Sequence, residues 1–132
     1  MLPTAVKLNV LRCLPEVQEH AGTIKSNKNN TPIVLATIHI ESAGDSNAVS
    51  KTGALGLMQI KPELWIRAGE TADMLFDPSF NVKRGCHILN WLYSKYGNTS
   101  DVMANYYGKT NKDWEKYVIK FWKAWNLYKD LK

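Results

Sequence analysis

The most apolar stretch of the chain predicts a buried helix. Thr31-Pro32 is a typical helix start, with a hydroxyl side chain at the N-cap and proline at the first helical position. The residues from Ile33 to Ile40 are apolar at almost every position, which is typical of a helix inside a core. Glu41 comes at the end of this predicted helix, where Ser42, Ala43 and Gly44 break the pattern.

Apolar residues recur at helical spacing in the rest of the chain as well. Residues 4–21 form a helical pattern that is interrupted at Pro15, and the polar loop 26–30 separates it from Thr31. Residues 61–65 predict a short helix or turn, and residues 82–96 predict a helix that ends at Gly97-Asn98. Residues 114–132 carry aromatic side chains at helical spacing, with lysines between them. We therefore expect a mainly α fold with at most a small β element.

The composition indicates one soluble globular domain. The chain has 132 residues, of which 45% are hydrophobic and 22% charged. No apolar run approaches the roughly 20 residues of a membrane span. The formal net charge of +5 fits attraction to an acidic cell wall or to anionic membrane. Because no nucleic-acid recognition motif accompanies this charge, we expect no nucleic-acid partner. The C-terminal aromatic helix is expected to pack on the domain, and weak membrane contact is the second interpretation.

The cysteines and histidines do not predict a metal site. Cys13 and Cys86 could form one bridge or stay reduced and buried, and we expect the reduced state. Neither has metal-ligand spacing with a histidine, so we expect neither metal nor cofactor. His39 lies two positions before Glu41, on another side of the helix, and is interpreted as a core or supporting residue.

Glu41 is the candidate acid. A carboxylate at the C-terminal end of a buried helix is disfavoured by desolvation and by the negative end of the helix dipole. Both effects raise the pKa and favour the protonated form near neutral pH, which is the form that acts as a general acid toward glycosidic oxygens. The alternative is that Glu41 only caps the helix or pairs with a surface lysine.

The residues after Glu41 carry a family pattern. The chain reads Glu41-Ser42, then Asn47-x-x-Ser50, then Gly53-Ala54-x-Gly56-Leu57-Met58-Gln59. This run resembles the core motif of the SLT-type lytic transglycosylases of the lysozyme superfamily. The Asp77-Pro78-x-x-Asn81 segment, Gly85 and the tyrosine motif at Tyr106 continue the resemblance, which covers roughly residues 15–120. It implies a lysozyme-like SLT domain over residues 15–132, preceded by a helical extension over residues 1–14, in one compact unit.

Two positions depart from the family pattern. Tyr107 stands where asparagine or histidine is common, which puts in doubt how substrate is held there. Lys61 stands two positions after Gln59, where an apolar residue such as methionine is frequent, and is expected to alter one sugar subsite. Tyr117 resembles a second tyrosine found in one branch of the family.

The resemblance implies cleavage of peptidoglycan glycan strands without water. Glu41 would protonate the oxygen that leaves N-acetylmuramic acid at its β-1,4 link to N-acetylglucosamine, then accept the proton of the C6 hydroxyl, giving a 1,6-anhydro end. Ser50 and Gln59 would hydrogen-bond sugar substituents. The remaining predicted substrate-binding residues are Met58, Tyr106, Tyr107 and Tyr117. Alternatively, Tyr106 and Tyr117 orient Glu41 through their hydroxyls.

Two other functions fit the same residues. A hydrolase resembling goose-type lysozymes would use a second acid, such as Asp45 or Asp73, to activate water. An inactive wall-binding module would keep the groove without turnover. Gly53, Ala54 and Gly56 are expected to let the backbone approach the sugar chain closely, or simply to form a tight turn.

The setting is predicted only coarsely. The N-terminus lacks the apolar segment of a signal peptide, so either a signal has been removed or another export route is used. We expect a monomer that acts in the periplasm or at the cell wall, in a phage-type or secretion-associated role.

Overall fold

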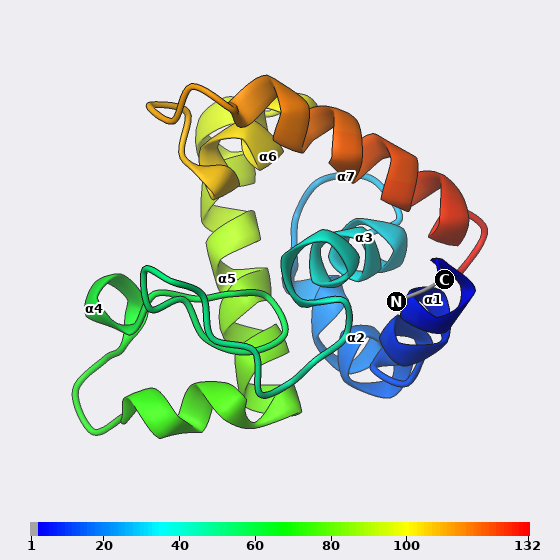
Figure 1. Ribbon diagram of the computed structural model, residues 1–132. Coiled ribbons are helices and arrows are strands. Elements are labelled where there is room, and N and C mark those ends of the chain that lie inside the picture. Colours follow the sequence, from blue (N-terminus) through cyan, green and yellow to red (C-terminus); the bar gives the residue numbers. More distant parts are fainter. Residues whose placement is uncertain (1–2) are drawn as a thin grey trace.

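A central helix surrounded by other helices organises the fold. The computed structural model describes residues 3–132 (Figure 1). The central helix is α3 (Thr31–Ser42), which packs against α1 (Pro3–Leu11), α2 (Leu14–His20) and α7 (Trp114–Tyr128). The long helix α5 (Pro78–Tyr96) packs on α2 and on α6 (Thr99–Tyr107). The short elements are η1 (Ala21–Thr23), α4 (Pro62–Trp65) and η2 (Ala72–Phe76). The prediction of a mainly α fold is confirmed.

The first eight residues of α3, from Thr31 to Ile38, are buried, so the predicted core helix is present. Its cap differs from the prediction, because Asn30 rather than Thr31 is the N-cap and makes no capping hydrogen bond. The Asn30 amide instead donates to the carbonyl oxygens of Ala21 and Ile24, at 3.1 and 2.7 Å. Asn30 therefore joins the loop to the end of η1, a tertiary role that the local helix-start signal does not contain.

The N-terminal helix contributes to the same hydrophobic core. Val10 of α1 is fully buried, and Cys13 just after α1 is 7% exposed. Cys13 and Cys86 are both free thiols in this core. Burial raises the pKa of Cys13 to about 11 and that of Cys86 to about 12, because the thiolate is poorly solvated there. Both thiols therefore stay protonated and unreactive near neutral pH.

The segment between α3 and α4 is held by turns and isolated bridges. Val49 and Leu55 form one antiparallel bridge and Leu55 and Ile60 another, and these are the only extended pairings among residues 3–132. The buried Asn81 of α5 makes three hydrogen bonds, two to this segment and one to η2. Its amide donates to the carbonyl oxygens of Leu55 (2.9 Å) and Leu75 (2.8 Å), and its oxygen accepts from the Met58 backbone N–H (2.8 Å).

Gly56 lies against Asn81 and explains why this turn needs glycine. Its φ of 76° is in the left-handed region, and a Cβ there would overlap the Asn81 amide and the Leu75 carbonyl oxygen. Gly56 therefore approaches α5 and η2 closely, and this contact requires glycine whether or not the backbone also approaches a sugar chain.

An ion pair fixes the segment that contains α4. Arg84 of α5 is 4% exposed, and its guanidinium makes a bidentate pair with Glu70, at 2.9 and 2.6 Å. It also donates to the backbone oxygen of Trp65 at the end of α4. This hydrogen bonding lowers the pKa of the Glu70 carboxyl to about 2, so the pair is ionised at neutral pH. Arg84 thus positions the α4 segment beside α5.

The last helix packs its aromatic face inward, as predicted for residues 114–132. The buried residues of α7 recur at helical spacing: Tyr117, Phe121, Ala124 and Tyr128. Tyr128 bonds His39 of α3 at 2.8 Å between Oη and Nδ1, which places His39 in a supporting contact. Among residues 3–132, no helix has the length and apolarity to span a membrane.

Candidate active site

Glu41 lies in the last turn of α3, which ends where Ala43 takes a left-handed conformation with φ of 54°. The Glu41 side chain is partly buried. Burial raises the pKa of Glu41 to about 7, and a hydrogen bond from Tyr117 acts in the opposite direction. Near neutral pH a substantial fraction of Glu41 is therefore protonated and able to donate a proton.

Two tyrosines from different helices stand beside this carboxyl group. The Tyr117 hydroxyl of α7 donates to Glu41 Oε2 at 2.6 Å. Tyr107, at the end of α6, stacks on Tyr117 with ring centroids 4.5 Å apart and planes 21° apart. The stack restricts the Tyr117 ring, and the ring in turn restricts the Glu41 carboxyl group.

A groove of about 570 Å³ opens from Glu41. Its neutral polar side chains come from the α3–α4 segment and from around α6: Ser50, Thr52, Gln59, Asn105 and Asn111. Its apolar and aromatic wall comes mainly from α4 and α5: Leu64, Trp65, Ile88, Trp91 and Leu92. Lys61 is the one charged side chain other than Glu41 among the described residues that line it. This mixture of neutral hydrogen-bonding groups and aromatic surface suits a sugar chain.

Ser50 and Gln59, which we expect from the sequence to hydrogen-bond sugar substituents, both line the groove. The Ser50 hydroxyl accepts from the Ala54 backbone N–H at 2.9 Å. The Gln59 amide nitrogen donates to the backbone oxygens of Ala48 (3.2 Å) and Gly56 (3.0 Å). These bonds leave the Gln59 carbonyl oxygen as an acceptor for substrate. Gln59 itself has a left-handed φ of 53°, which turns the chain at this point.

Met58 does not shape the groove, so its predicted substrate contact is wrong. Its side chain is fully buried and lies against Gly85 of α5, where an added Cβ would be 3.2 Å from Met58 Cβ. The Met58 backbone oxygen accepts from the Tyr106 hydroxyl at 2.6 Å. Tyr106 lines the groove, and its hydroxyl does not bond Glu41. Of the two tyrosines that could orient Glu41, Tyr117 is the one whose hydroxyl donates to the carboxyl group.

Glu41 and Tyr107, which line the groove, also line a smaller cavity of about 330 Å³. Its other lining residues are Ile40, Asp113, Lys116, Tyr117 and Lys120. The sequence predictions did not include Lys116 and Lys120. Lys120 is three positions from Tyr117 and Lys116 is four from Lys120, so helical spacing could have indicated both once Tyr117 was placed beside Glu41.

The acids named for a hydrolytic alternative lie elsewhere. Asp45 and Asp73 are exposed, and neither is among the described residues that line the groove or the smaller cavity. Asp45 accepts from the backbone N–H of Asn47 at 2.9 Å in a local turn. Asp113 is the carboxylate, besides Glu41, among the described lining residues of these two cavities. No group of three or more metal-ligand side chains suited to an ion is found within residues 3–132.

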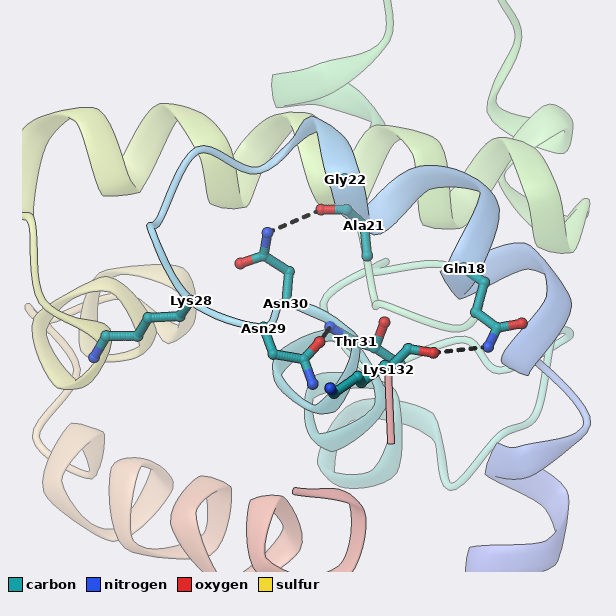
Figure 2. Close-up of a pocket in the computed structure, with 8 residues that line it drawn as sticks. All are labelled: Gln18, Ala21, Gly22, Lys28, Asn29, Asn30, Thr31 and Lys132. Atoms are coloured by element: carbon teal, nitrogen blue, oxygen red, sulfur yellow. Dashed lines mark hydrogen bonds between the residues drawn. The ribbon is translucent and has the colours of Figure 1, made fainter. Parts of the chain in front are cut away.

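Another cavity, of about 340 Å³, lies at the opposite end of α3 (Figure 2). Figure 2 shows Lys28 and Lys132 on its wall together with the start of α3 at Thr31. The Gln18 amide donates to the backbone oxygen of Lys132 at 2.9 Å across it. Since none of the described lining residues is a carboxylate, histidine or cysteine, this cavity offers no acid and is not the candidate active site.

The fold is similar to that of two solved lytic transglycosylases. The lytic transglycosylase Slt of Pseudomonas aeruginosa, solved as an inactive glutamate-to-glutamine mutant, matches 96% of this chain with 24% of its own, at a TM-score of 0.66 and 20% identity. The 70 kDa soluble lytic transglycosylase SLT70 of Escherichia coli matches 87% of this chain with 21% of its own, at a TM-score of 0.62 and 20% identity.

Two relatives are similar in sequence. A transglycosylase of Enterobacteria phage PRD1 is 30% identical over 95 residues, which are 71% of this chain. The membrane-bound lytic murein transglycosylase E of Buchnera aphidicola is 29% identical over 108 residues, or 75% of this chain. The matches span 35% and 44% of the lengths of these two proteins. The family model of the transglycosylase SLT domain matches residues 21–126, so the chain belongs to the SLT transglycosylase domain family.

Proposed function

We propose that this chain is a peptidoglycan lytic transglycosylase with Glu41 as its single general acid and base. Two observations together carry the proposal. Glu41 is partly buried and has a pKa of about 7, and no other carboxylate is among the described residues that line the groove. Most glycosidases that use water have a second carboxylate, which either activates the water or acts as the nucleophile in its place. A reaction whose nucleophile is already on the substrate needs only one.

In the first step, protonated Glu41 donates its proton to the glycosidic oxygen between N-acetylmuramic acid and N-acetylglucosamine. The C1–O bond breaks, and the N-acetylglucosamine unit leaves as a neutral alcohol. Positive charge develops at C1 of the muramic acid, where the sugar's own acetamido oxygen can stabilise it. Tyr117 stabilises the Glu41 carboxylate that forms, because its hydroxyl already donates to Oε2.

In the second step, the Glu41 carboxylate accepts the proton of the C6 hydroxyl as that oxygen bonds to C1. The product is a 1,6-anhydromuramic end, and Glu41 is protonated again for the next cycle. In the proposed complex, the groove-lining residues Ser50, Gln59 and Asn105 hydrogen-bond the sugar substituents, and Tyr106 and Tyr107 contact the sugar rings near Glu41. We place this reaction at the bacterial cell wall, and the transglycosylase of a phage among the relatives fits a phage-type setting.

Mass spectrometry of the fragments released from purified peptidoglycan tests the proposal. We expect anhydromuramic ends from the unaltered protein, and a loss of at least about 100-fold in rate from Glu41→Gln with strand binding retained. Reducing ends would overturn the proposal in favour of a hydrolase, for which Asp113 would be the first residue to replace. Binding of strands by the unaltered protein without any release of fragments would indicate a wall-binding module instead.

A further inference from the structure

The two cavities that meet at Glu41 have different chemistry. The larger groove carries neutral polar groups and aromatic rings, with Lys61 as its one other described charged residue. The smaller cavity carries Lys116 and Lys120 against a single aspartate, Asp113. When Glu41 is protonated, the described lining of the smaller cavity therefore has a net positive charge. A site of this kind suits a carboxylate better than a sugar hydroxyl.

The register of α7 puts both lysines at the acid. Tyr117 is buried and donates to Glu41, and Lys116 and Lys120, four residues apart, lie on one neighbouring face of the same helix. The Lys116 side chain is 81% exposed, and its Nζ is 3.9 Å from Asp113 Oδ1, a weak surface contact. Lys120 forms no ion pair within residues 3–132. Both ammonium groups are thus available to an anion that enters the cavity.

Each muramic acid carries carboxylates on one side arm. Its lactyl group ends in a carboxylate when free, and in an amide when a stem peptide with its own carboxylates is attached. We propose that the smaller cavity binds the carboxylates of this arm through Lys116 and Lys120 while the sugars occupy the larger groove. The inference rests on the proposed function, because it names the part of the same substrate that this cavity recognises. Glu41 is the point where both parts of the substrate meet.

The contribution of the lysines is a matter of affinity and salt dependence. Exposed ammonium–carboxylate pairs are modest and are screened by salt. Removal of both lysines should therefore weaken strand binding by about three- to tenfold at low ionic strength and by much less at high salt.

Binding is measured on Glu41→Gln protein, so that the result does not depend on turnover. The test variant adds Lys116→Gln and Lys120→Gln. The matched control adds Lys28→Gln and Lys132→Gln, an equal loss of charge at the cavity at the opposite end of α3 (Figure 2). Three soluble ligands are compared: strands with stem peptides, strands stripped of peptides to free lactyl carboxylates, and peptide-bearing strands whose carboxylates are amidated.

Weaker binding by the test variant, for the peptide-bearing strands or the stripped strands but not the amidated ones, supports the inference and tells which carboxylate is bound. Equal weakening for all three ligands, no weakening for any, or the same weakening in the matched control would overturn it. Product analysis with the unaltered protein separates the two claims. Strands that bind through the lysines but give no anhydro ends would refute the proposed function and leave the inference intact.

Discussion

The Tyr117 hydroxyl donates a 2.6 Å hydrogen bond to Glu41 Oε2. The two residues are 76 positions apart in the chain, and their helices, α3 and α7, pack against each other. Burial raises the pKa of Glu41, and this bond offsets part of that rise, because the bond favours the ionised form. Glu41 therefore titrates near neutral pH, which suits the acid and base roles that we propose for it.

Replacing Tyr117 with phenylalanine should move the pH dependence of cleavage. Without the hydroxyl the carboxylate form loses a donor, so the pKa of Glu41 rises further above its present value of about 7. The alkaline limb of kcat/KM should shift to higher pH, and kcat should fall by about tenfold, because the carboxyl group is less well oriented. The measurement is a pH profile of fragment release from soluble strands.

Tyr107→Phe is the matched control, because it keeps the ring stacked on Tyr117 and removes a hydroxyl that does not bond Glu41. Its pH profile should match that of the unaltered protein. An unshifted profile for Tyr117→Phe would show that Tyr117 supports only the packing of α7, as a purely structural residue would.

The position of Glu41 was predictable from local features, and the family resemblance of the residues after it favoured its interpretation as the acid. An apolar helix followed by Ser42 and Ala43 indicates where a carboxylate must lie, and the burial that raises its pKa follows from that place. The environment of Met58 could not be read in the same way. Gln59, the next residue of the motif, lines the groove, but the Met58 side chain fills the space that Gly85 leaves in α5, a contact between distant parts of the chain.

The stability of the folded chain should fall as Glu41 ionises. Its pKa is about 7 when folded and near 4.5 when unfolded, so the unfolded state ionises first as the pH rises. Stability from this residue is fully present below pH 4.5 and is lost between about pH 4.5 and 7. Glu41→Gln lacks this loss, so it should gain about 2–4 kcal/mol relative to the unaltered protein between pH 4 and pH 8.

Urea unfolding of the two proteins at pH 4, 6 and 8 measures this difference. A difference in unfolding free energy that is the same at every pH reflects the substitution itself. Only the part of the difference that changes with pH reports the titration of Glu41. Stability curves that stay parallel from pH 4 to 8 would contradict a raised pKa for Glu41. The proposed acid would then be largely ionised at neutral pH.

Asn81→Ala should destabilise the fold by about 2–4 kcal/mol. The substitution leaves the backbone oxygens of Leu55 and Leu75 and the backbone N–H of Met58 without their buried partner. Because these groups fix the segment that carries Gln59, activity should fall as well. Chemical denaturation measures the loss of stability, with Asn126→Ala on the exposed face of α7 as the control. A loss no larger than that of the control would show that water replaces the Asn81 amide.

The helices whose pattern lies within their own residues were predictable from the sequence. The contacts between loops and helices were less predictable, because they join residues far apart in the chain. The period of the buried face of α7 is visible in the sequence, and so is the glycine that ends α5. Local pattern placed the cap of α3 one residue too late, at Thr31, because the Asn30 amide bonds η1 rather than its own helix. For Gly56 the sequence left open a close approach to sugar or a tight turn, because its neighbour Asn81 is 25 positions away.

Gly85→Ala tests the contact between α5 and the motif segment. Alanine favours a helix by about 1 kcal/mol over glycine. At this position, however, the new Cβ would overlap the buried Met58 thioether and lie 3.2 Å from Met58 Cβ. Overpacking of this kind costs about 1–3 kcal/mol, so the net change should be destabilising. Tyr106, which donates to the Met58 backbone oxygen, should shift with that segment and reduce cleavage.

A double-mutant cycle with Met58→Ala separates overpacking from other causes. Met58→Ala alone should destabilise by about 2–5 kcal/mol, because it leaves a cavity in the core. Combined with Gly85→Ala, the added methyl group occupies part of that cavity, so the double variant should be more stable than the sum of the two single effects predicts. Additive losses in urea unfolding would mean that the two residues do not compete for the same space. The cost at Gly85 would then lie in the helix itself.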